Sequence, residues 1–267
     1  MTYSSETICA ISGAALLNLK RWYRSGFINK YVSGNEWSEA QLQDVLDMTR
    51  LTSQGATIRE IRAAQETERP LRTGGWAARR GDMLWQLEYG SEQSLNVLLR
   101  KLASNFTGDD FVLQLLLPLN QWLRDDVRAG AGRRRERFHR LIVAHAGSAM
   151  RNATRTAAVP LLLESLSEQN KTEIWLEAIR LSRQGFCVEV RHFSAVHQPA
   201  SSHQHHLLWC GAGLTELMHQ HYMTYLDKGH PVLLCGPDRR VHHLFPQVPA
   251  VACAAAFPLL PAVIFRR

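Results

Sequence analysis

The residues of this chain whose types and spacing could do chemistry lie near its amino end. Lys20, Arg21 and Arg24 are close together in a run that also contains Asn18 and Trp22. On a helix, Lys20 and Arg24 would be neighbours on one face, because they stand at positions i and i+4. Cations placed in this way can contact phosphates, and their longer side chains can reach base edges in a groove. The pattern predicts an anion-binding face, with an ordinary solvated basic helix as the alternative.

Two short helices are needed to position these cations. Apolar residues recur at close to helical spacing near the start of the sequence, namely Ile8, Ile11, Leu16, Leu19 and Trp22. Ser12-Gly13 interrupts the series, as a tight turn between two crossed helices requires. The second helix would then have an apolar back and a basic front, which suits docking into a major groove.

The segments that follow continue in a specific order. They are an apolar exit from the basic helix at 26–28, a capping box at 38–41, an amphipathic helix over 42–51 and a further helix start at 57–61. In this order and spacing, residues 6–65 resemble the DNA-binding domain of MerR-type transcription regulators. Gly26-Phe-Ile28 stands where that family has a Gly followed by two leucines.

The resemblance implies a winged helix-turn-helix over residues 1–65 that reads double-stranded promoter DNA through the helix around Asn18–Arg24. The contacts to DNA that we expect from it are Asn18, Lys20, Arg21, Trp22, Arg24 and Lys30. It also implies a homo-oligomer. The layout is similar to regulators of biofilm and light responses, some of which are antagonised by a partner protein, so a protein antagonist or co-regulator is a further expected partner.

The wing is the segment in which this chain departs from the family's pattern. Such proteins usually carry arginines there, whereas residues 29–37 hold Lys30 as their one cation and have Asn35-Glu36 in the place of the expected Arg. Trp37 can still pack the wing onto the core. A lost phosphate contact weakens binding to every sequence and flattens its salt dependence. The alternative is therefore a MerR-like protein that has lost DNA binding and acts through protein–protein contacts.

The remaining sequence predicts a multidomain α plus α/β protein. Residues 66–82 combine charges, a proline and a Gly pair, which predicts a linker. Residues 83–157 have the apolar spacing of a helical bundle, with a kink at Pro118. The arginine run Arg133–Arg137 is predicted to be a solvated helix start, and the alternative is an anion-binding or partner-binding patch.

Residues 158–267 alternate strand-like and helix-like stretches. Strands are expected at 159–163, 186–190, 206–210 and 231–235, and helices at 171–184 and 214–227. This rhythm favours a doubly wound parallel sheet of the flavodoxin-like kind.

A helical bundle followed by such a sheet resembles the cobalamin-binding module of some light-sensing or cobalamin-sensing MerR-like regulators. Beside His139, Phe138 and Arg128 stand where that module has a Glu and a Trp. Asn170 replaces the ligand His, and its amide has no basic ring nitrogen for cobalt; Glu173 replaces a Gly. We expect a degenerate cobalamin-binding-like domain that holds no cofactor and oligomerises or senses a signal or partner. A cobalamin-dependent carrier or enzyme is the second alternative.

No catalytic or metal-binding residues are predicted. The densest histidine cluster, His203 to His206, offers ligands on one loop without an evident fourth ligand. The cysteines are scattered and form no CxxC pair: Cys9, Cys187, Cys210, Cys235 and Cys253. A nucleophile elbow, a P-loop lysine and an HExxH motif are all absent from the sequence, so we expect a regulator and not an enzyme.

Composition is compatible with this expectation. The net charge of +7 favours an anionic partner, although it does not say where that partner binds. The sequence contains neither a recognisable signal peptide nor a transmembrane stretch, so we expect a cytoplasmic protein without a membrane partner.

Overall fold

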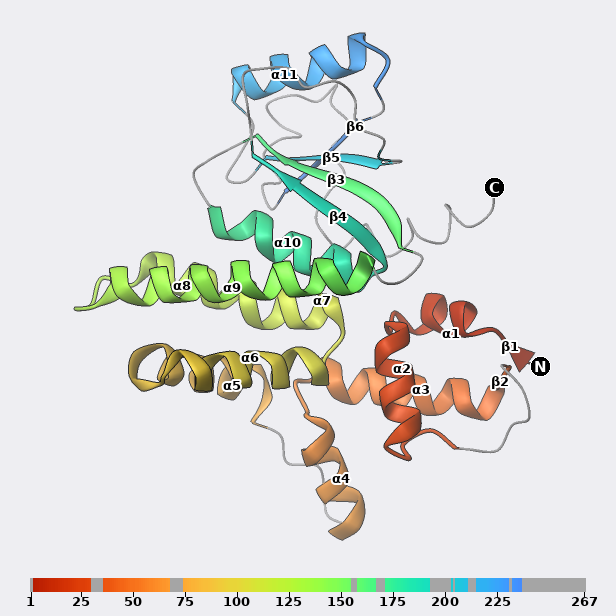
Figure 1. Cartoon of the computed structure of the whole chain (residues 1–267). Helices are drawn as coiled ribbons and strands as arrows, with labels where there is room; N and C mark the ends of the chain where they lie inside the picture. The colour runs from red at the N-terminus through yellow and green to blue at the C-terminus, as the bar shows by residue number, and fades with distance from the viewer. Residues whose placement is uncertain are drawn as a thin grey trace. The chain divides into compact units, whose positions relative to one another are not determined.

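The computed structural model describes residues 2–29, 36–67, 74–154, 158–166, 171–192, 203, 205–210, 215–230 and 232–236. Within these residues the chain is mostly helical and carries a small parallel sheet (Figure 1). It divides into two compact units between Phe138 and His139, inside the long helix α9 (Ala131–Thr154). The boundary expected from the sequence, between residues 157 and 158, lies just after the end of that helix.

The amino-terminal part of the first unit is built from short helices and one pair of very short strands. In chain order these are β1 (Thr2–Tyr3), α1 (Ser5–Ser12), α2 (Leu16–Arg24), β2 (Trp37–Ser38), α3 (Glu39–Ser53) and α4 (Ile58–Thr67). β1 and β2 pair antiparallel. Ile8, Leu19, Trp22, Val45 and Ile61 belong to one buried core, which joins helices that are separated in sequence.

Local signals in the sequence fix where these helices begin and end. The predicted capping box is confirmed, because the Ser38 side chain accepts a bond from the Gln41 amide at 3.3 Å and the Gln41 side chain accepts one from the Ser38 amide at 2.9 Å. Helix α1 ends at Gly13, whose φ of +69° lies in the left-handed region that favours glycine. The predicted turn between the first two helices is therefore confirmed.

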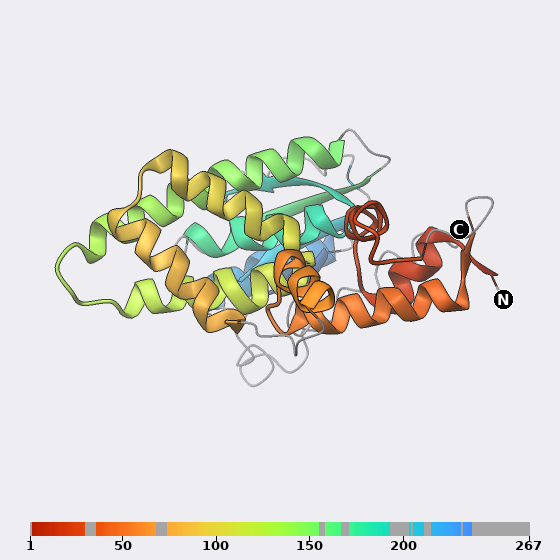
Figure 2. The same cartoon turned by 90° about the horizontal axis from the view of Figure 1, so that it is seen from below.

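Helices continue through the rest of the first unit. They are α5 (Gly75–Tyr89), α6 (Glu92–Asn105), α7 (Gly108–Asp110), the π-helical segment η1 (Phe111–Leu116), α8 (Leu117–Asp125) and the start of α9. Helices α5 and α6 lie side by side in both views (Figures 1 and 2).

Helix α5 begins inside the segment predicted to be a linker, so residues 75–82 are helical and not linker. The reason is a tertiary anchor at Trp76. Its indole nitrogen donates to the Ser53 carbonyl at 2.8 Å, and its ring centroid lies 4.5 Å from that of Phe106. Helix α4 likewise extends to Thr67. The composition of residues 66–82 predicted a linker because it carries no information about such long-range contacts.

The kink predicted at Pro118 falls where the helix changes type. Pro118 stands at the start of α8, directly after the π-helical segment η1. A proline has no amide hydrogen and its ring crowds the carbonyl four residues earlier, here that of Gln114. That carbonyl instead accepts a bond from the Arg80 guanidinium at 3.0 Å. The wider π turn and the arginine together accommodate the missing helical bond.

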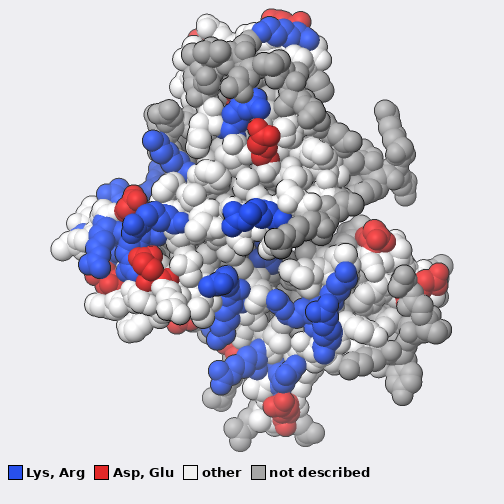
Figure 3. All heavy atoms as spheres, viewed as in Figure 1, with Lys and Arg blue, Asp and Glu red and all other residues white. Residues whose placement is uncertain are grey.

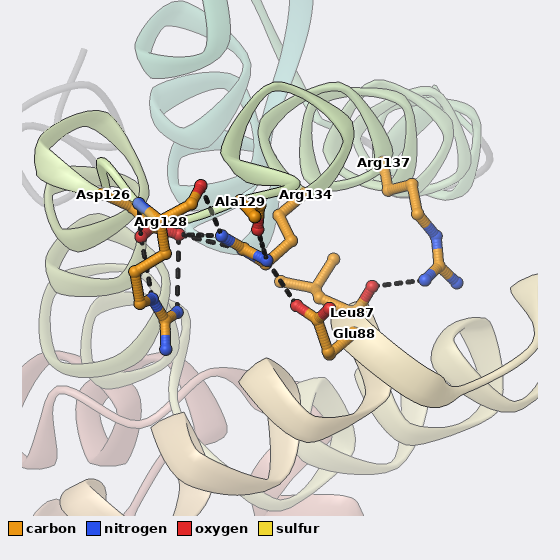
Figure 4. A network of polar contacts seen from close by, with 7 residues as sticks. All are labelled: Leu87, Glu88, Asp126, Arg128, Ala129, Arg134 and Arg137. Atoms are coloured by element: carbon orange, nitrogen blue, oxygen red, sulfur yellow. Dashed lines mark hydrogen bonds and ion pairs between the residues drawn. The ribbon is translucent and has the colours of Figure 1, made fainter.

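The arginine run at the start of α9 is largely structural. Arg134 is buried and donates to Asp126 at 2.8 Å, to Glu88 at 2.5 Å and to the Ala129 carbonyl at 2.9 Å (Figure 4). Arg128 also donates to Asp126, at 2.9 Å. Hydrogen bonds from Arg128 and Arg134 hold the pKa of the Asp126 carboxyl well below its ordinary value.

Arg137, one turn further along α9, joins α9 to the end of α5. Its guanidinium donates to the carbonyls of Leu87 and Gly90, the latter at 2.8 Å, and to the Glu92 carboxylate at 2.8 Å. The prediction of a solvated helix start is therefore wrong for Arg134 and Arg137, which are buried. It holds for Arg133 and Arg135, which are exposed.

The second unit contains a four-stranded parallel sheet. Its strands and the helices between them are β3 (Val159–Ser165), α10 (Lys171–Arg183), β4 (Phe186–Arg191), β5 (His205–Trp209), α11 (Glu216–Asp227) and β6 (Val232–Cys235). The strand order is β4-β3-β5-β6, and every neighbouring pair is parallel. Helix α10 lies on one face of the sheet and α11 on the other (Figure 1).

The elements predicted for this unit are confirmed close to their expected bounds. The centre of β3 is buried, since Leu161, Leu162 and Leu163 are almost fully inaccessible. Strands covered on both faces read as continuous apolar runs, which is why they could be recognised in the sequence. In the described part of the chain, no helix combines the length and the apolar content needed to cross a membrane.

Candidate nucleic-acid interface

Helix α2 presents one continuous side to solvent. Because successive residues advance by about 100° around a helix, five residues share that side. They are Leu16, Leu17, Lys20, Arg21 and Arg24, of which Arg21 is half-buried and the others are exposed. The opposite side of the helix consists of Asn18, Leu19 and Trp22, all buried in the core of the first unit.

The turn before α2 sets the direction in which this helix leaves the core. The Ser12 hydroxyl donates to the Ile8 carbonyl at 2.7 Å and accepts a bond from the Ala14 amide at 3.2 Å. Ala14 is buried beneath the turn. At the other end, the Phe27 amide donates to the Trp22 carbonyl at 3.0 Å, which closes α2. Both ends of α2 are therefore held by the same core.

Two of the residues predicted to contact DNA are buried instead. Trp22 has no exposed surface and Asn18 is 1% exposed, so neither side chain reaches the surface of α2. Trp22 is one of the largest side chains in the core, which explains its burial through the hydrophobic effect. The amide nitrogen and oxygen of Asn18 have no hydrogen-bond partner among the described residues. Both residues support α2 from behind.

The cations of α2 are available for an external anion. In the described part of the chain, Lys20, Arg21 and Arg24 take part in no ion pair. Partial burial lowers the pKa of Arg21, which remains a cation. Lys30, the other predicted cation, lies outside the described residues. The structure therefore brings three of the six predicted contact residues to one exposed side.

Sequence reasoning missed the basic residues of α4. Arg62 donates to the Ser25 carbonyl at 3.1 Å, and its guanidinium carbon lies 5.5 Å from the centre of the Phe27 ring. Ser25 and Phe27 directly follow α2, so Arg62 lies beside the end of that helix. Arg59, one turn earlier on α4, is exposed. Lys and Arg side chains gather over α2 and α4 on one face (Figure 3). The spacing of Arg59 and Arg62 was the available signal.

The residues that flank the predicted wing are attached to the core. The Trp37 indole donates to the Ser5 hydroxyl at 2.9 Å, and its ring centroid lies 6.0 Å from that of Tyr23. The prediction that Trp37 packs against the core is confirmed. Asn35 lies outside the described residues, and Glu36 is exposed.

Two histidines of the second unit, His206 and His221, lie beside a buried carboxylate. Glu164 on β3 is buried, lies 2.8 Å from the His206 ring nitrogen and accepts a bond from the Tyr225 hydroxyl at 2.9 Å. His221 on α11 lies 3.7 Å from the same carboxylate. Burial opposes ionisation of Glu164, but the bonds with His206 and Tyr225 prevail and lower its pKa. Among the described residues, no group of three or more His, Cys, Asp or Glu is arranged to hold a metal ion.

The positions aligned with the cobalamin module are occupied by contacts within the chain. Phe138 is buried, and the His139 ring nitrogen lies 3.1 Å from the Thr172 hydroxyl. Arg128 lies over the Trp122 ring at 4.6 Å. Glu173, which stands where the module has a Gly, is buried in the first turn of α10. Asn170, like Cys253 and His197, lies outside the described residues.

The four described cysteines can be judged by their bonding and by the pKa of their thiols. Within the described ranges, Cys9, Cys187, Cys210 and Cys235 form no disulfide bond. Burial raises the pKa of the Cys9 thiol to about 11 and that of Cys235 well above its ordinary value. Both are therefore protonated at neutral pH, as expected of structural cysteines.

Comparison with known proteins relates the chain to a transcription regulator. Residues 159–232 match the family model described as the C-terminal domain of the transcriptional regulator MlrA. The HTH-type transcriptional regulator MlrA of Escherichia coli (strain K12) is 17% identical to this chain over 202 residues, which are 75% of this chain and 83% of that protein. Both similarities support the prediction of a transcription regulator of the MerR type.

Proposed function

We propose that this protein is a DNA-binding transcription regulator whose residues 1–65 form a MerR-type winged helix-turn-helix and read double-stranded promoter DNA through α2. The observation that carries the proposal is the side of α2 that faces solvent. It presents Lys20, Arg21 and Arg24, which form no ion pair with any residue that the structure describes, while the other side is fixed in the core. The major groove is wide and deep enough to admit an α-helix, and cations on the helix can then contact phosphates.

The cations have different tasks in this proposal. Lys20 and Arg24 contact phosphates, which fixes the position of α2 in the groove without selecting a sequence. Arg21, with its planar guanidinium, can donate to a phosphate or to the two acceptors of a guanine. The N-cap of α2, Ala15, has no capping side chain, so the first-turn amides of α2 can also face a phosphate.

Helix α4 extends the same interface. Arg62 is held beside the end of α2 by its bond to Ser25 and its contact with Phe27. Together with Arg59 it adds two cations next to those of α2. These residues are candidates to replace the phosphate contacts that the wing lacks. Asn18 and Trp22 act indirectly, by keeping α2 in place.

The second unit supplies oligomerisation or sensing of a signal or a partner protein. Counted within the unit, its strand order is 2-1-3-4, the beginning of the flavodoxin-like order. We propose that it works without cobalamin, because the buried Glu173 stands in the place of a residue whose lack of a side chain leaves room for the cofactor. An absorbance spectrum of the full chain after incubation with cobalamins tests this part, and a stable cobalamin band would contradict it.

The DNA-binding proposal is tested by measuring affinity for duplex DNA against salt. A duplex pool of random sequence serves as the probe, with binding followed by gel shift between about 50 and 200 mM salt. Each lost phosphate contact lowers the slope of log affinity against log salt by about 0.9. Lys20→Ala and Arg24→Ala should each lower it by about that amount, and the double variant by about 1.8.

Arg135→Ala provides the matched control, because Arg135 is an exposed arginine on α9 outside the proposed interface. It should leave the slope unchanged. A wild-type slope near zero, or an equal fall in the control, would overturn DNA binding through α2. The first of these results would favour the alternative of a relative that acts through protein contacts, for which the acidic Glu36 in the wing is the motivation.

A further inference from the structure

Two large apolar side chains are exposed on the same side of α2 as its cations. Leu17 is 64% exposed and Leu16 is 40% exposed, whereas Leu19 on the opposite side is fully buried. Both lie in the first turn of the helix. Leu17 lies two turns before Arg24 and Leu16 one turn before Lys20, so the leucines and the cations form one strip.

On this strip, only the cationic side chains can read bases by hydrogen bonding. Its members are Leu16, Leu17, Lys20, Arg21 and Arg24, with no side-chain amide, hydroxyl or carboxylate among them. The amide of Asn18 points into the core and cannot take this role. Lys20 and Arg24 are assigned to phosphates and Arg21 can read a guanine, so any further discrimination between bases by this strip has to come from apolar contact.

The flanking charges indicate what covers the leucines. Cations that are unpaired within the described ranges can bind a polyanion, and a duplex is a polyanion that also exposes apolar groups between its phosphates. In the major groove those groups are the 5-methyl groups of thymine. A recognition helix places its amino-terminal residues at the base edges, which is where Leu16 and Leu17 stand. Cations further along the helix are then free to reach the backbone.

We propose that Leu16 and Leu17 are specificity-determining residues that read thymine methyl groups in the major groove. This inference rests on the proposed function, because it requires α2 to enter the groove. Contact with a methyl group distinguishes T·A from A·T and from both G·C orientations, since the methyl lies on one side of one base pair. The sites that this protein prefers should therefore contain thymines at fixed positions facing the first turn of α2.

The test removes the methyl groups from the DNA. Duplexes bound by the full-length chain are selected from a random pool and remade with deoxyuridine in place of one thymine at a time. At a contacted thymine, the wild-type protein should bind about fourfold more weakly, the factor expected for one buried methyl group. Leu17→Ala should bind the thymine duplex more weakly and should no longer distinguish thymine from deoxyuridine at the position that Leu17 contacts.

Leu217→Ala is the matched control, because Leu217 on α11 is also 64% exposed. It should keep the full response to deoxyuridine. Alanine is favourable in helices, so Leu17→Ala should fold, and an unchanged melting curve by circular dichroism verifies this. Leu16→Ala provides an independent second variant, which should lose the response at a different thymine.

The outcomes separate this inference from the function on which it rests. If the wild type binds duplexes with the expected salt dependence but is indifferent to deoxyuridine at every position, the leucines do not read methyl groups and DNA binding stands. If the response persists in both Leu16→Ala and Leu17→Ala, the inference is also wrong. If no duplex binds even at low salt, the proposed function fails as well, and the strip would instead serve a protein partner.

Discussion

Replacing Arg137 by methionine should destabilise the first unit by about 3 kcal/mol. The variant keeps the buried aliphatic stem and removes the guanidinium. That group donates to the Leu87 carbonyl at the end of α5 (Figure 4) and also to the Gly90 carbonyl. A hydrogen bond from a charged donor to a buried acceptor contributes about 1.5–3 kcal/mol. The Leu87 bond lies in this range, and the half-buried Gly90 bond contributes less because water can replace it. The bond to the exposed Glu92 adds at most about 1 kcal/mol.

Urea and thermal unfolding followed by circular dichroism measure this effect. A loss of about 3 kcal/mol corresponds to a fall in melting temperature of roughly 6–12 °C. Arg135→Met is the matched control from the same arginine run. Arg135 is exposed, so its replacement should change the free energy of unfolding by less than about 0.5 kcal/mol. Equal stabilities of the two variants would refute the reasoning that burial of the guanidinium, and not its charge alone, joins α9 to α5.

Three further predictions follow from single residues. Because the folded-state pKa of Glu164 is lowered, its carboxylate stabilises the fold above pH about 4.5 and this contribution is lost as the pH falls. The gap in unfolding free energy between wild type and Glu164→Gln should therefore narrow in urea titrations below that pH; a gap that widens in acid would contradict this. Asn18→Leu removes a buried amide that has no hydrogen-bond partner among the described residues. It should raise the free energy of unfolding by about 1 kcal/mol, which a higher melting temperature would show. Gly13→Ala and Gly55→Ala both place alanine at positive φ, which costs about 1–2 kcal/mol. At Gly55 the new Cβ would also lie 2.8 Å from the backbone nitrogen of Trp76 and 2.9 Å from the carbonyl carbon of Gly75. The unfolding midpoint of Gly55→Ala should therefore fall further than that of Gly13→Ala, and equal midpoints would be inconsistent with this clash.

The elements that were predicted correctly are those encoded by neighbouring residues. The capping box at Ser38–Gln41 is confirmed because its partners are three residues apart and need nothing from the rest of the fold. The strands of the second unit could be recognised for a similar reason, since burial on both faces requires a continuous apolar run. The parallel pairing of the strands could be anticipated from the alternation of strands and helices.

The candidate site was predicted only in part. The sequence placed Lys20 and Arg24 on one face, and both are exposed. It could not show that Asn18 is buried or that Arg62 lies beside the end of α2, because those facts depend on where other helices pack. The exposure of Leu17 was equally hidden, since an apolar residue in a helix is usually expected to face the core.

The amino-acid sequence by itself determined the turn at Gly13, the helical strip that carries the cations and the parallel strands of the second unit. Each depends on φ preferences, capping or apolar periodicity within a few residues. The tertiary structure decided which arginines of the run at 133–137 are buried and which face solvent. It also decided where α5 begins, because Trp76 bonds to the Ser53 carbonyl, and it placed His206 and His221 beside Glu164. Burial and ion pairing depend on partners distant in sequence, and only the folded chain brings those partners together.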